Sequence, residues 1–286
     1  MSKSNCKAVT SYIPCEIRKW YCSSSVSEVH QVTKHEGIIV CIDASGFTAL
    51  TKRLANQGKE GPEILTRVLN SFFESISNVV FQFEGDVLKF AGDALWAFFA
   101  DGLNLESFFS SILIALDEVN SSEFLRDTTK LDVHLGAESG FFHLASLGDP
   151  EHRLEAELIG EMLDVVYSAC DIAKANQFVV GPALANQLDN KEKLEVVDGN
   201  FYFVKSGTIH EYNNSGSAIV KSYSDIPENR YLERYIPLDV LNRINTSETS
   251  FTSQSEYRQV TVLFANFEYE YAVDCADPES SINALN

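Results

Sequence analysis

Basic residues, long apolar runs and paired cysteines are all scarce in this chain of 286 residues. Lys and Arg number 22 against 41 Asp and Glu, so the formal net charge is −19. This charge disfavours a nucleic-acid partner, because phosphate backbones are bound by clustered Lys and Arg, and it disfavours anionic membrane surfaces. The six cysteines form no CxxC or Cys/His spacing, which favours reduced thiols over a disulfide framework or a sequence-local metal site.

No long apolar stretch follows Met1, so the sequence predicts no secretory signal. The most apolar later windows, such as residues 108–116, are far too short to cross a bilayer. We therefore expect no transmembrane segment and a cytoplasmic location.

Hydrophobic residues make up 45% of the chain, enough for a large core. The apolar patterns predict an α+β fold, with a mostly antiparallel sheet and helices on its faces, compatible with a ferredoxin-like core. The expected strands span 37–42, 87–90, 94–99, 131–138, 141–147, 178–180, 194–197 and 201–204. The expected helices span 47–55, a long segment after Pro62, 105–119, 158–175 and 182–188.

The same patterns divide the chain into four parts. Residues 1–36 are a polar lead-in, with a strand expected near 12–17, and residues 37–207 form the main domain. Residues 208–255 are a linker with a short amphipathic piece at 231–241. Residues 256–286 read as the start of a second, similar domain that is cut off, because the run at 260–266 resembles 38–43, with Asn266 in place of Asp43.

Two carboxylates lie 50 positions apart beside apolar runs. Asp43 ends the strand at 37–42, and Asp93 lies in the turn of the expected hairpin. Brought together, two carboxylates can hold a pair of hard divalent cations, which can clamp a nucleoside triphosphate. Taken alone, Asp43 could instead cap the next helix, and Asp93 could be an ordinary turn residue.

The segments DASGFT (43–48) and KFAGDA (89–94) resemble the class III nucleotidyl cyclases. Within that family they are most similar to the first catalytic domain of the bicarbonate-responsive soluble adenylyl cyclases. The resemblance runs from about Gly37 to Val204. It resumes at 231–241 and at 260–267, where those enzymes begin their second catalytic domain.

The resemblance implies adenylate cyclase activity, a phosphorus–oxygen lyase reaction. The ribose 3′-hydroxyl of ATP attacks the α-phosphate, giving cyclic AMP and pyrophosphate. Asp43, Asp93 and the backbone carbonyl of Ala44 would bind two Mg²⁺ or Mn²⁺ ions. The segment Ser45-Gly46-Phe47-Thr48 would hold the nucleotide, and this agrees with a helix N-terminus that suits phosphates and with a glycine that permits close approach.

Three further positions are compared with the family. Lys89 matches a lysine that binds bicarbonate, although a solvated strand lysine is an equal alternative. The arginine that accompanies this lysine is replaced by Tyr167, and a phenol lacks the charged guanidinium fork. His134 matches a phosphate-facing lysine, and its alternative role is that of a sheet residue.

The family also implies that the active site forms between two cyclase domains, joined in cis or in trans. The second domain contributes an asparagine, an arginine and the base-selecting residues, and the helix that follows Gly160 in this chain carries no such pair. We therefore expect the chain alone to be nearly inactive. The alternative function is a non-catalytic regulatory domain that pairs with another cyclase domain. A ferredoxin-like nucleic-acid binder is disfavoured by the acidic charge and by the lack of a basic, aromatic sheet face.

Overall fold

The computed structural model describes residues 12–23, 32–55, 60–100, 102–125, 130–188, 194–204 and 232–246. Its helices are α2 (Cys15–Ser23), α3 (Phe47–Ala55), α4 (Glu60–Gln82), α5 (Leu105–Asn120), α6 (Glu161–Ile172), α7 (Pro182–Gln187), the 3₁₀-helix η2 (Leu232–Tyr235) and α8 (Leu238–Thr246). Its strands are β1 (Val32–Ser45), β2 (Asp86–Ala91), β3 (Ala94–Phe99), β4 (Asp132–Asp149), β5 (Arg153–Ile159), β6 (Gln177–Val180), β7 (Leu194–Asp198) and β8 (Phe201–Val204). None of the helices within these ranges is long and apolar enough to cross a membrane.

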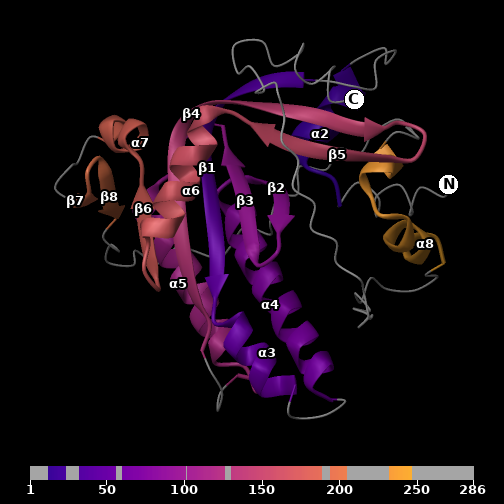
Figure 1. The fold of residues 1–286 in the computed structure, drawn as a ribbon, viewed down its shortest axis with the longest axis horizontal. Coiled ribbons are helices and arrows are strands. Elements are labelled where there is room, and N and C mark those ends of the chain that lie inside the picture. The colour runs from indigo at the N-terminus through magenta and orange to yellow at the C-terminus, as the bar shows by residue number, and fades with distance from the viewer. Residues whose placement is uncertain are drawn as a thin grey trace, which may run out of the picture.

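All of these strands belong to one sheet, in the order β2-β3-β1-β4-β6-β8-β7. Strand β5 lies off this path and pairs with residues 143–149 of β4. Every pairing is antiparallel except that of β4 with β6. Helices cover both faces, so the predicted α+β class with a mostly antiparallel sheet is confirmed. Figure 1 shows β1 crossing the centre of the sheet and leading directly into α3.

The alternation of side chains along β1 supplies two hydrophobic cores, one on each face of the sheet. Ile38, Val40 and Ile42 pack with apolar residues of α3, α4, α5 and α7. Ile39 and Cys41 face the other way and pack with residues of α2, α6, η2 and α8. Because both faces are buried, the strand reads as a continuous apolar run, as expected for a central strand.

The prediction of two strands around Ser139-Gly140 was wrong, because β4 is a single strand from Asp132 to Asp149. Its partner β1 pairs with it from Asp132 to Ala145, and Ile38 and Gly37 pair with Ser139 and Gly140. The turn-like dipeptide therefore stays in the ladder, where its backbone groups are hydrogen-bonded. The far end of β4 turns back into β5, which the sequence analysis missed, and helix α6 begins at Glu161 rather than at residue 158.

The expected strand near residues 12–17 was also wrong. Helix α2 begins at Cys15, directly after Pro14, and buries Ile17 and Trp20 in the core. Proline is favoured at a helix start because its ring fixes the required φ. Strand β1 begins at Val32, so the expected boundary between residues 36 and 37 lies inside a strand.

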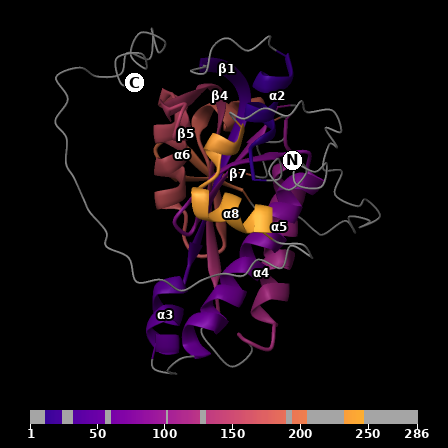
Figure 2. The ribbon, with the colours of Figure 1, turned by 90° about the vertical axis from the view of Figure 1, so that its right-hand side faces the viewer.

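The amphipathic piece expected within the linker forms η2 and α8. Leu232, Tyr235 and Ile236 are buried, and the Tyr235 hydroxyl donates to Ser146 Oγ on β4 at 2.6 Å. Figures 1 and 2 show these gold helices beside the projecting β4–β5 hairpin. This part of the expected linker therefore packs on the domain, whereas the expected second-domain strand at 260–267 lies outside the described residues.

Gly136 sets how closely α6 packs on the sheet. A Cβ at this position would overlap the backbone nitrogen of Cys170 and lie 2.5 Å from the Val166 carbonyl oxygen. These atoms belong to helix backbone and cannot rotate away. We expect Gly136→Ala to destabilise the domain by about 1–3 kcal/mol, the usual cost of overpacking. Urea unfolding measures this change. Gly92→Ala is the control, because a Cβ added at Gly92 would meet no atom within 4 Å apart from its chain neighbours.

The control variant carries its own backbone cost, since Gly92 has a φ of +67° and a non-glycine residue is strained there. The comparison therefore separates backbone strain in an open turn from a steric overlap inside the core. A midpoint for Gly136→Ala equal to that of the wild type would show that α6 can move away from the sheet without cost.

Candidate functional site

The two predicted carboxylates, Asp43 and Asp93, lie at the same end of the sheet. Asp43 pairs with Ala94 across β1 and β3, and Asp93 directly precedes Ala94 in the turn between β2 and β3. The N–H of Ala44 donates to the backbone oxygen of Asp93 at 3.3 Å. This hydrogen bond joins the end of β1, with Asp43, to the β2–β3 turn, with Asp93.

The electrostatics of Asp43 reflect this convergence. Burial raises the pKa of Asp43 above its usual range, and the nearby charge of Asp93 raises it further. His134 lowers this pKa, and Asp171 raises it. Asp43 is half-buried, whereas Asp93 is exposed. An ionised Asp43 therefore costs free energy in the folded protein, and a bound cation would offset that cost.

His134 lies next to Asp43, as the strand register dictates. The two residues pair directly across β1 and β4, so their side chains project from the same face of the sheet. The backbone oxygen of His134 accepts a hydrogen bond from Cys170 Sγ on α6 at 3.5 Å. The structure thus brings this predicted substrate contact to the carboxylates.

The segment from Ser45 to Thr48 forms the turn from β1 into α3. Gly46 has a φ of +98°, a conformation that favours glycine, and a Cβ there would lie 3.0 Å from the Lys130 carbonyl oxygen. The first helical hydrogen bond of α3 runs from the Leu50 N–H to the Gly46 oxygen at 2.9 Å. The N–H groups before Leu50 thus lack intrahelical acceptors, which suits an anion beside Asp43.

Within this segment, Phe47 has a structural role. Its side chain is buried, and its ring meets that of Phe72 edge-on with centroids 5.6 Å apart. Thr48 is exposed, and Ser45 and Gly46 are half-buried. A ligand at the start of α3 would therefore meet the Phe47 backbone and not its ring.

Lys89 lies in the middle of β2, and Tyr167 of α6 packs on the β2–β3 hairpin. The Lys89 ammonium forms an ion pair with Glu157 of β5 at 2.8 Å. Tyr167, which is 53% exposed, packs on Trp96 with ring centroids 4.6 Å apart, and Trp96 is the strand partner of Lys89. The lysine therefore has a carboxylate as its partner where the family pairs it with an arginine.

Asp171 is a third carboxylate near the site, and the sequence analysis did not single it out. It is exposed near the end of α6, and its charge raises the pKa of both Asp43 and Cys41. Its position in a predicted helix was clear, but no local pattern shows that this helix end reaches the end of β1. Only the packing of α6 on Gly136 makes the proximity visible.

The groups at this end of the sheet fit a hard divalent cation. The available donors are the carboxylates of Asp43 and Asp93, with the Ala44 backbone beside them. Asp43 is half-buried, and its pKa is raised. In a strand, the N–H and C=O of one residue point to the same edge, so the Ala44 carbonyl faces the side of Asp93. Oxygen donors of this kind are the ligands that Mg²⁺ and Mn²⁺ prefer.

Comparisons with known proteins show what the whole chain resembles. The chain is 26% identical over 266 residues to human adenylate cyclase type 10, and 26% identical over 268 residues to the rabbit protein of the same name. Each match covers 82% of this chain but only 16% of the relative. No protein-family model matches the sequence. The chain is thus homologous to a small part of these much longer proteins.

Among solved structures, a bacterial light-regulated adenylyl cyclase superposes with a TM-score of 0.52 at 15% sequence identity. The match covers 71% of this chain and 61% of that chain. At this identity the likeness shows the fold, which is that of the class III cyclase catalytic domains. The resemblance read from the motifs at 43–48 and 89–94 is confirmed.

Proposed function

We propose that this chain, a homologue of adenylate cyclase type 10 with the fold of a class III catalytic domain, is the metal-binding half of an adenylate cyclase. Paired with a second cyclase domain, it would convert ATP to cyclic AMP and pyrophosphate in cytoplasmic cyclic AMP signalling. The observation that carries the proposal is the meeting of Asp43 and Asp93 at one end of the sheet, joined by the Ala44–Asp93 hydrogen bond.

In this proposal, Asp43, Asp93 and the Ala44 carbonyl would hold two Mg²⁺ or Mn²⁺ ions. When bound, such a pair activates the attacking hydroxyl and stabilises the charge on the phosphates. The protein supplies a half-buried carboxylate whose ionised form is costly without a cation. A bound cation would therefore stabilise the ionised form of Asp43.

The remaining residues of the site would position the triphosphate. The first turn of α3 offers N–H groups of Phe47 and Thr48 that lack intrahelical acceptors, and Gly46 supplies the positive φ with which the chain enters that turn. His134 lies beside Asp43 and could donate to a phosphate oxygen. A neutral imidazole offers one N–H and no full charge, so its contribution would be smaller than that of a lysine.

Bicarbonate is not part of the proposed function. Lys89 is already paired with Glu157, and Tyr167 stands where the family has an arginine. An added anion would have to displace a carboxylate from Lys89 without help from a guanidinium. We therefore treat Lys89 as a strand lysine that holds β2 to β5.

The test is a reconstituted assay. The purified chain is mixed with a cyclase domain that carries the transition-state asparagine and arginine but lacks metal-binding aspartates, so that only one composite site can form. With Mn²⁺, we expect ATP to give cyclic AMP and pyrophosphate, and GTP to give much less product. Cyclic GMP as the main product would overturn the choice of ATP. A complex that forms but makes neither product would favour the regulatory, non-catalytic alternative.

A further inference from the structure

Two cysteine thiols that take no part in the proposed reaction lie in the core beside the carboxylate site. Cys41 lies on β1, two residues before Asp43, and Cys170 lies near the end of α6. Both side chains are buried in the same apolar cluster, on the face of the sheet that α6 covers. The fold thus brings two thiols that are far apart in sequence to one face of the sheet.

The strand register and a glycine bring the two cysteines next to each other. Cys41 faces Gly136 across β1 and β4, and side chains in such a pair project from the same face with Cβ atoms about 4.5–5.5 Å apart. The backbone of α6 takes the place of the missing side chain. A Cβ at Gly136 would overlap the Cys170 nitrogen and lie 2.8 Å from the Cys170 Cα. Cys170 therefore occupies the position beside the Cys41 side chain.

The two thiols also interact directly. The hydrogen bond between them, more than burial, raises the pKa of Cys41. The Cys170 Sγ donates to the backbone oxygen of His134 at 3.5 Å, so this sulfur lies over the segment of β4 that pairs with Asp43. Both cysteines are free thiols in the structure. Two thiols already in contact need only a short movement to become bonded.

A bond between these sulfurs would disturb the carboxylate site. The sulfur–sulfur bond is about 2.0 Å long, which is much shorter than a contact between two thiols, so β1 and α6 would have to shift. Helix α6 cannot move closer to the sheet, because its backbone already touches Gly136. The shift therefore falls on the end of β1, which carries Asp43, and Cys170 loses its hydrogen bond to His134. A misplacement of about 1 Å at a reacting group can cost roughly 10²-fold in rate.

We propose that Cys41 and Cys170 form a reversible disulfide in response to a hydroperoxide, and that this bond switches off the site at Asp43 and Asp93. The switch rests on the proposed cyclase function, whereas the formation of the bond does not. A thiol pair that is reduced at rest and oxidised transiently is the usual form of a cytosolic disulfide.

Hydrogen peroxide takes two electrons from the sulfur pair. The deprotonated sulfur of Cys170, which is 7% exposed against 3% for Cys41, attacks one peroxide oxygen, and the O–O bond breaks with loss of hydroxide. The sulfur of Cys41 then displaces hydroxide from the sulfenic acid on Cys170 and loses its proton. The two hydroxides and the two thiol protons give two water molecules. A dithiol reductant reverses the bond by thiol–disulfide exchange.

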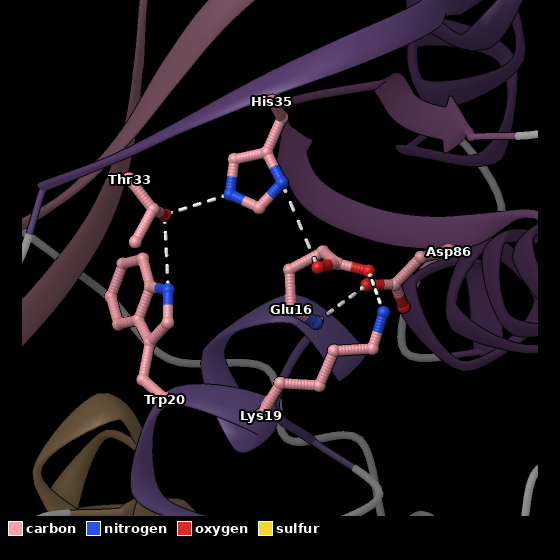
Figure 3. A network of polar contacts seen from close by, with 6 residues as sticks. All are labelled: Glu16, Lys19, Trp20, Thr33, His35 and Asp86. Atoms are coloured by element: carbon pink, nitrogen blue, oxygen red, sulfur yellow. Dashed lines mark hydrogen bonds and ion pairs between the residues drawn. The ribbon is translucent and has the colours of Figure 1, made fainter. Parts of the chain in front are cut away.

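Burial sets the rate of this oxidation. Buried thiols react slowly, so the oxidant would reach Cys170 when the end of α6 opens locally. The half-buried Cys15 is less protected and is the matched control thiol. It begins α2, whose contacts run from the Glu16 N–H to Asp86 and from the Trp20 indole to Thr33 (Figure 3).

Peptide mass mapping of the full chain after treatment with hydrogen peroxide tests the formation of the bond. We expect a cross-linked pair of peptides that contain Cys41 and Cys170, lighter by two hydrogens than the separate peptides. Cys41→Ala and Cys170→Ser should each abolish this product, and Cys15→Ser should keep it. Absence of the cross-link in the folded chain, or its appearance only after unfolding in urea, would overturn the proposal.

The reconstituted pair of domains tests the switch. After the chain has been oxidised and the peroxide removed, we expect cyclic AMP production to fall at least about tenfold and dithiothreitol to restore it. Cys170→Ser, which keeps a donor for the His134 oxygen, should retain its activity through the same treatment. Full activity of the cross-linked chain, or an equal loss in Cys170→Ser, would overturn the switch. A reduced pair that makes no cyclic AMP would refute the proposed function, and the mapping alone would then decide whether the bond forms.

Discussion

Replacing Asp43 or Asp93 with alanine is expected to lower cyclic AMP production by the chain, paired with a complementing second domain, by at least about 10³-fold. Each carboxylate would be a ligand of the proposed cation pair, and a metal ion supplies several kcal/mol of transition-state stabilisation. Since about 1.4 kcal/mol corresponds to a factor of ten in rate, the loss of either ligand should bring activity close to background. A discontinuous assay of cyclic AMP with saturating Mn-ATP measures the effect.

A loss of fold would not explain this result. Because burial and the charge of Asp93 raise the pKa of Asp43, the ionised side chain destabilises the folded state at neutral pH. Its contribution to stability improves only as pH falls through that raised pKa. Asp43→Asn should therefore lose activity while keeping or increasing its unfolding midpoint in the absence of metal.

The matched control is Asp117→Asn, which removes an exposed carboxylate from α5 on the opposite face of the sheet. It should retain the activity of the unmodified pair. Near-normal cyclic AMP production by the Asp43 or Asp93 variant would refute the metal assignment, whatever the behaviour of the control.

The second large effect concerns the chain on its own. Without a second domain, we expect cyclic AMP production at least about 10⁴-fold below that of the reconstituted pair. The helix α6, which would face the substrate in a homodimer, carries Asp164 and Ser168 but no adjacent asparagine and arginine pair in its sequence EMLDVVYSACDI. Removing one stabilising donor typically costs about 10²–10³-fold, and here two would be missing.

This expectation is checked by titrating the second domain into a fixed amount of the chain. Activity should rise from background and saturate at equal amounts of the two domains. An arginine-to-alanine variant of the added domain should form the complex but leave the rate near that of the chain alone. Robust cyclic AMP production by the purified chain without any added domain would contradict the need for a partner.

Much of the fold and the heart of the candidate site followed from local sequence. The apolar run before Asp43 predicts a central strand because both faces of that strand are buried, and Gly92-Asp93 predicts a tight turn because glycine tolerates positive φ. The helix that opens at Phe47 follows from Gly46, which breaks the strand. The positions of Asp43 and Asp93 are thus set by short-range rules, and the motif resemblance added the idea that the two residues meet.

Other features depended on contacts between distant segments. Ser139-Gly140 looks like a turn, but pairing with Gly37 and Ile38 keeps it inside β4. Asp171 reaches the site only because Gly136 lets α6 approach the sheet. Cys41 and Cys170 carry no local sign of their proximity. The sequence by itself determined where the central strand ends, where helix α3 begins and where the hairpin turns, since these depend on neighbours along the chain. The tertiary structure alone decided strand length, register and the side chains that gather around α2, because those depend on hydrogen bonds and packing between residues far apart in sequence.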